Sequence, residues 1–141
     1  MTWNANPFAS PRGAAQAYNR VGVETGVASA DAHRLVLMLY DGVLKSLAVA
    51  RGHMQRREVA AKGIALSRAI QILDEGLIAS LDETAGGDLA RQLKSLYAYM
   101  GRRIVLANLR NDEKLLDEVA TLLTDLRQAW EAIGTQPKTS P

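Results

Sequence analysis

The sequence lacks several features that would assign a protein to an oxidising or membrane environment. It contains no cysteine in 141 residues, which excludes disulfide bonds, thiolate nucleophiles and cysteine metal sites. No apolar run approaches the roughly 18 residues that a membrane-spanning helix needs. The N-terminus shows no charged leader followed by an apolar core, as a secretory signal would. We therefore expect a cytoplasmic protein of the reducing cytosol without membrane insertion.

Sequence signatures of catalysis are also missing. Neither His33 nor His53 has a Glu three positions before it, the pair that di-iron bundle enzymes project into their cores. The motifs GxxxxGK[ST], GxGxxG and GxSxG, which hold phosphates or a nucleophilic serine, do not occur. We expect no enzyme, no cofactor and no metal. A metal-binding bundle enzyme is the weaker alternative, which elemental analysis of the purified protein would test.

Charge and aromatic content argue against a nucleic-acid partner. The 17 Lys and Arg side chains are interspersed with 15 Asp and Glu, which leaves a formal net charge of +2. The basic pairs Arg56-Arg57 and Arg102-Arg103 do not continue into longer runs. Base stacking needs exposed rings beside such charges, and the chain has two Trp, four Tyr and one Phe. These arginines are better explained as solvated ends of side chains that lie along apolar helices.

Helical periodicity accounts for most of the chain. Apolar residues recur every three or four positions in four segments, namely Asp31–His53, Glu58–Leu81, Asp88–Arg110 and a last one that Asn111 or Asp112 caps and Gly134 ends. Short connections between long helices favour an all-α fold, an antiparallel up-down-up-down four-helix bundle. The expected domains are a flexible arm over residues 1–13, a bundle domain over 14–134 and a disordered tail over 135–141.

Each predicted helix has an apolar stripe that should form the core. Asp31 caps the first helix, and Gly86-Gly87 breaks the chain after the second, where a tight turn favours residues without a Cβ atom. The stripe residues are Leu35, Met38 or Leu39, Gly42 or Val43, Leu47 and Ala50; Ile64 or Leu66, Ile70, Leu73, Leu77 and Leu81; and Leu115 or Leu116, Val119, Leu122 or Leu123, Leu126, Trp130 and Ile133.

The third predicted helix is more apolar than packing on one neighbour requires. One stripe comprises Leu93, Leu96, Tyr97, Met100, Ile104 and Ala107. A second stripe, on an adjacent face, comprises Tyr99, Val105, Leu106 and Leu109. The helix is therefore either buried between several helices or offers one face to another molecule.

Seven short segments in order give the chain a resemblance to a known family. They are Ala17-Tyr18 with Val21 and Val23-Glu24; His33 through Leu39-Tyr40-Asp41-Gly42; Ala69-Ile70 with Ile72, Gly76-Leu77 and Leu81-Asp82; Gly86-Gly87; Leu96-Tyr97 with Tyr99-Met100; Ala107 through Asp112; and Trp130. In this set the chain closely resembles the FliS-type flagellar secretion chaperones. It departs from them at Asp31-Ala32, where the family commonly has Ser-Pro.

The resemblance implies a cytosolic export chaperone for flagellin. Such a protein binds the disordered C-terminal segment of flagellin one to one, prevents premature polymerisation and keeps it competent for type III export. The client would lie in grooves between bundle helices. Other flagellar export or regulatory proteins are further candidate partners. The alternative is a self-assembling helical adaptor, which would use the same apolar faces to form a homodimer when no client is present.

Residues that could contact the client are Tyr18, Met38, Tyr40, Gly42, Tyr99, Met100, Leu106, Asn108 and Leu109. Tyr18 could be a displaceable lid on the groove or a direct client contact. The tyrosines suit half-exposed walls, and methionines suit an adaptable surface. Gly42 and Gly101 indicate close approach of another helix or of the client. We expect Tyr97 in the core and Trp130 in a structural role.

Overall fold

The computed structural model describes residues 32–135, and these residues are helical almost throughout without a β-strand. The helices are α2 (Ala32–Gln55), α3 (Val59–Gln71), the π-helix η2 (Ile72–Ile78), α4 (Glu83–Arg110) and α5 (Glu113–Thr135). The predicted all-α fold is confirmed. The expected arm over 1–13, Tyr18, the Asp31 cap and the tail beyond residue 135 lie outside the described residues.

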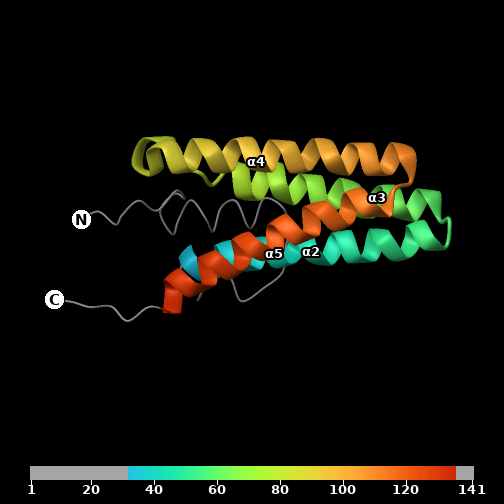
Figure 1. Ribbon diagram of the computed structural model, residues 1–141, viewed down its shortest axis with the longest axis horizontal. Helices are drawn as coiled ribbons and strands as arrows, with labels where there is room; N and C mark the ends of the chain where they lie inside the picture. The colour runs from blue at the N-terminus through green and yellow to red at the C-terminus, as the bar shows by residue number, and fades with distance from the viewer. Residues whose placement is uncertain (1–31, 136–141) are drawn as a thin grey trace.

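The helices form a ring in which neighbours in sequence are neighbours in space. In Figure 1, α2 and α4 run from left to right, whereas α3 and α5 run from right to left. Helix α2 packs against α3 and α5, and α4 packs against α5, η2 and α3. This is the predicted up-down-up-down order. The ring leaves a seam between α3 and α4 on its surface.

The predicted stripes supply most of the core. Fully buried apolar side chains include Leu35, Leu39, Val43, Leu47, Leu66, Leu73, Leu77, Tyr97, Met100, Ile104, Leu116, Val119 and Leu123. One stripe prediction is wrong, because Ile133 is 45% exposed. Of the alternatives Ile64 and Leu66, Leu66 is in the core and Ile64 is 73% exposed. On α3 the consecutive residues Ala65 and Leu66 both face inward, which turns Ile64 to the surface.

The second predicted helix is two elements instead of one. After α3 the chain widens into η2, where the Ala79 amide donates to the Asp74 carbonyl oxygen five residues earlier, at 3.2 Å. The wider turn still buries Leu73 and Leu77. The segment ends where the buried Ser80 hydroxyl donates to the Leu77 carbonyl oxygen, at 3.0 Å. The backbone therefore changes its hydrogen bonding without interrupting the apolar stripe.

Helix α4 begins earlier than the sequence pattern predicts. Asp82 caps it, since its carboxylate accepts from the amides of Thr84 and Ala85, both at 3.0 Å. Gly87 then adopts φ 55° and ψ −133°, a left-handed conformation that favours glycine. The predicted break at Gly86-Gly87 is thus a kink within α4, one helical turn after the true start.

The α4–α5 connection confirms the predicted caps. Asn111 ends α4 in the left-handed region at φ 51°. The carboxylate of Asp112 accepts from the Lys114 amide at 2.9 Å and so caps the start of α5. Two polar residues therefore reverse the chain between α4 and α5.

The end of α5 is fastened to the start of α2. The Trp130 indole donates to the His33 carbonyl oxygen at 2.9 Å, and His33 Nε2 donates to the Trp130 carbonyl oxygen at 2.5 Å. The two rings stack with centroids 4.9 Å apart. A Cβ atom at Gly134 would overlap the His33 ring, so glycine is required there for packing. The predicted structural role of Trp130 is confirmed.

A pair of buried tyrosines links α2 to α4 inside the core. The hydroxyls of Tyr40 and Tyr97 share a hydrogen bond of 2.7 Å, and the rings are tilted at 55°. Neither side chain is more than 2% exposed. Burial raises the pKa of Tyr40 to about 12 and raises the pKa of Tyr97 well above its usual value. Both hydroxyls therefore stay neutral in the folded protein.

We expect the free energy of unfolding to fall as the pH rises above about 10, where tyrosines of the unfolded chain ionise. Folded Tyr40 keeps its proton up to about pH 12. Unfolding therefore releases protons in this window, so the stabilisation is complete below pH 10 and disappears as the pH passes about 12. Urea midpoints across the window measure the slope. The Tyr40→Phe/Tyr97→Phe double variant should show a shallower slope, and equal slopes would contradict this account.

Candidate protein-binding groove

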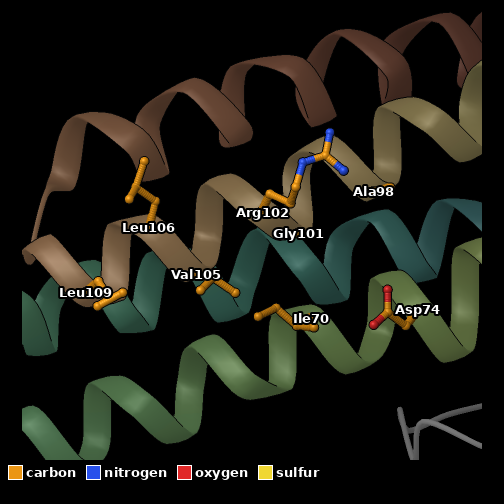
Figure 2. A pocket seen from close by; sticks show the side chains of 8 residues that line it. All are labelled: Ile70, Asp74, Ala98, Gly101, Arg102, Val105, Leu106 and Leu109. Carbon is orange, nitrogen blue, oxygen red and sulfur yellow. The ribbon is translucent and has the colours of Figure 1, made fainter.

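An open hollow lies on the seam between α3 and α4. Its volume is about 610 Å³. Figure 2 shows the lining side chains, which are Ile70, Asp74, Ala98, Gly101, Arg102, Val105, Leu106 and Leu109. Val105 and Leu109 remain 52% and 75% exposed although both are large apolar side chains. No other residue in the range 32–135 covers them, so within that range this apolar face of α4 has no partner.

A second hollow of about 510 Å³ adjoins the first. It is lined by Ala60, Gly63, Ile64, Ser67, Arg68, Gln71 and Asn108. Asn108 and Leu109 are consecutive on α4, and Ile70 and Gln71 are consecutive on α3, so the two hollows meet along the same seam. We call the two sets of lining residues together the α3–α4 groove.

The first hollow carries one charge of each sign. Asp74 projects from η2, and Arg102 projects from α4 on the opposite wall (Figure 2). No ion pair joins the two within the described part of the chain. Asp74 and Arg102 are both exposed residues. The groove thus combines an apolar surface with a carboxylate and a guanidinium that an incoming molecule could pair with.

A buried lysine fixes the spacing of the two groove helices. Lys62 on α3 is only 6% exposed. Its ammonium donates to the Asn108 carbonyl oxygen at 3.1 Å and to the Asn111 side-chain oxygen at 3.0 Å. A cation at the C-terminal end of α4 also complements the helix dipole. This contact joins α3 to the last turn of α4 beneath the second hollow.

Three of the predicted client-contact residues lie in the groove. Leu106 and Leu109 line the first hollow, and Asn108 lines the second. Tyr40 and Met100 lie in the core instead, at 2% and 0% exposure, so in this conformation no surface contact is available to either. This corrects the expectation of a half-exposed groove wall at Tyr40 and of an adaptable binding surface at Met100. Both side chains pack among apolar core residues, and the Tyr40 hydroxyl shares a hydrogen bond with the Tyr97 hydroxyl.

Three other predicted residues lie away from the groove. Met38 and Gly42 are half-buried on α2. Tyr99 is half-buried on the α5 side of α4, where its hydroxyl donates to the Glu118 carboxylate and the Arg103 guanidinium lies 5.6 Å from its ring centre. Arg103 also donates to Glu118 at 2.8 Å. Tyr99 therefore helps to join α4 to α5.

The sequence did not single out the α3 wall of the groove. Ile64 was expected in the core only as an alternative to Leu66, and no role was expected for Gly63, yet both line the second hollow. Val105 belongs to the predicted second stripe of α4 and lines the first hollow, although it is absent from the predicted contact set. Continuing that stripe as an exposed surface would have found Val105. No comparable signal marks α3, because its exposed face contains only isolated apolar residues.

Residues 32–135 contain neither a metal-ion cluster nor a membrane-spanning helix. No three His, Asp or Glu side chains come together there in a way that could hold a metal ion. None of the helices in this range has the combination of length and apolar character that crossing a bilayer requires.

Comparison with known proteins assigns the chain to a family. The model of the family described as "Flagellar protein FliS" matches residues 14–137. The chain belongs to the FliS family. A similar relative is the flagellar secretion chaperone FliS of Salmonella typhimurium (strain LT2), 47% identical over 125 residues, which cover 89% of this chain and 91% of the relative.

Two further FliS-family relatives show the same breadth of similarity. The flagellar secretion chaperone FliS of Escherichia coli (strain K12) is 46% identical over 116 residues, 82% of this chain and 85% of the relative. The flagellar secretion chaperone FliSB of Pseudomonas aeruginosa is 44% identical over 117 residues, 83% of this chain and 92% of the relative. This FliS-family chain is a flagellar secretion chaperone and not an enzyme.

We expect Lys62→Met to lower the free energy of unfolding by about 1–3 kcal/mol. The substitution keeps the buried apolar stem but removes two charge-assisted hydrogen bonds to the end of α4. Urea denaturation measures the change. The control is Lys45→Met, because Lys45 is exposed on α2 away from the groove. Equal midpoints for the Lys62→Met and unchanged proteins would show that the contact does not hold α3 to α4.

Proposed function

We propose that the protein binds the C-terminal segment of flagellin in the cytoplasm, one molecule to one, and holds it until export. The segment would be kept from polymerising because its apolar residues are covered. Support comes from the FliS family membership and from the exposed apolar residues of the α3–α4 groove. The observation that carries the proposal is the exposure of Val105 and Leu109 on a helix whose other face already fills the core.

The groove suits an apolar helix better than a small molecule. Its two hollows are open, and they run along the seam between two roughly antiparallel helices. Full burial of one large aliphatic side chain is worth about 1.5–3 kcal/mol, so covering Ile64, Val105 and Leu109 gives a client helix a substantial gain. An amphipathic helix presents apolar residues at a matching spacing, as in other helix-in-groove complexes.

The groove alone is too small to hold a disordered client. Ordering a disordered segment costs about 2–5 kcal/mol or more, so tight binding calls for a total interface well above about 2,000 Å². The client should therefore extend beyond the groove onto neighbouring faces of the bundle. In this proposal the α3–α4 groove is one part of a larger client-binding surface.

We expect full-length flagellin to bind at least about tenfold more tightly than flagellin truncated at its C-terminus, which is a difference of about 1.4 kcal/mol. Burial of apolar surface and folding of the client should give a large negative heat-capacity change. Isothermal titration at several temperatures measures both. Equal affinities for the two flagellins would reject the proposal. Light scattering with and without a C-terminal peptide would reveal a homodimer that the client disperses.

We also expect fold and binding to separate in two variants of α4. Ile104→Ala removes a side chain with 0% exposure and should cost about 2–5 kcal/mol of stability. Leu109→Ala removes a side chain that is 75% exposed, so the melting temperature should change little while the client binds more weakly. Thermal denaturation and titration with the flagellin peptide give the two readouts. A loss of stability from Leu109→Ala as large as that from Ile104→Ala would contradict the assignment of faces.

A further inference from the structure

Two glycines in the groove helices have no role in the internal packing. Gly63 lies within α3 and Gly101 near the middle of α4, where glycine destabilises a helix relative to alanine. A Cβ atom added at either position would meet no heavy atom within 4 Å. Gly134 and Gly87 differ from them, because the His33 ring explains the first and a positive φ explains the second. Packing within the described bundle therefore gives no reason for glycine at Gly63 or Gly101.

Both glycines face the α3–α4 groove. Gly101 lines the first hollow and Gly63 lines the second, so each exposes a stretch of helix backbone to the space between α3 and α4. The distance between packed helices depends on the side chains at the contact, and glycine permits the closest approach. A helix bound in the groove could therefore approach the backbone more closely at Gly63 and Gly101 than it could if these residues were alanine.

The charges beside Gly101 indicate what the occupant carries. Arg102 follows Gly101 on α4, and Asp74 lies on the η2 wall of the same hollow (Figure 2). The two are not joined to each other by an ion pair among the described residues. A helix could pair with both residues if its apolar face had a carboxylate on one side, toward Arg102, and a cation on the other, toward Asp74.

We infer that a helical segment of the client lies along the α3–α4 groove with small side chains packed on Gly101 and Gly63. The inference rests on the proposed function and adds the close contact at the two glycines and the charge pattern of the segment. Its apolar face covers Ile64, Val105 and Leu109. Its carboxylate faces Arg102, and its cation faces Asp74.

The test is alanine substitution at the two glycines, with a matched control. Gly101→Ala and Gly63→Ala should each raise the melting temperature by about 2–4 °C, because alanine favours the helix and the added methyl meets open space. Each should also weaken binding of a flagellin C-terminal peptide about tenfold, since the methyl occupies the contact. The control is Gly52→Ala on α2, where only the mobile end of Arg56 approaches at 3.3 Å. It should leave the affinity unchanged.

Several results would overturn the inference. If the unchanged protein binds the peptide and Gly101→Ala and Gly63→Ala bind it within twofold of that affinity, the close contact is wrong while the proposed function stands. If the unchanged protein does not bind the peptide, the proposed function fails and the inference fails with it. A Gly101→Ala protein that loses a dimer in sedimentation but keeps its client affinity would assign the groove to a second copy of the chain.

Charge reversal tests the chemistry of the occupant separately. Arg102→Glu should weaken peptide binding about tenfold at low ionic strength and less at high salt, because the pair lies near solvent. Lys45→Glu makes the same change in net charge at an exposed position of α2 and should have little effect. Equal affinities for the Arg102→Glu and Lys45→Glu proteins would overturn the assigned carboxylate.

Discussion

The hydrogen bond between Tyr40 and Tyr97 sets the rotation of α2 and α4 about their own axes. The side chains of both tyrosines are at most 2% exposed, and a buried hydroxyl without a hydrogen bond costs free energy of folding. The two hydroxyls therefore hydrogen-bond to each other. Once Tyr97 points inward, the helical period places Met100 and Ile104 in the core and turns Val105 and Leu109 toward the seam with α3. The exposed apolar face of α4 is thus a consequence of how its buried face is anchored.

Much of the fold follows from apolar periodicity, since each helix has a stripe and short connections leave few ways to arrange four helices. Periodicity does not show how the backbone bonds within a stripe, however. The π-helix Ile72–Ile78 buries the same leucines that an α-helix would bury, so the pattern could not reveal it. The start of α4 was missed for a related reason. Asp82 caps a single turn with no apolar stripe, and the stripe becomes visible only beyond the kink at Gly87.

The candidate groove was predicted in part, because its α4 wall belongs to a helix with two apolar stripes. Leu106 and Leu109 stood out for that reason. Tyr40 and Met100 were misplaced because an amphipathic or adaptable side chain fits a wall and a core equally well, and only the arrangement of a distant helix decides between them. The α3 wall could not be predicted from one helix at a time. Gly63 can be assigned to the wall only when the open space between α3 and α4 is known.

The contact between His33 and Trp130 joins residues 97 positions apart in the chain. Helix α2 must therefore wait for nearly the whole bundle to be synthesised before α5 can cover it, whereas its hairpin with α3 can form early. A nascent chain would expose the apolar surface of α2 until Trp130 has left the ribosome. This flagellar secretion chaperone thus has an interval during its own synthesis in which an apolar surface of α2 is uncovered.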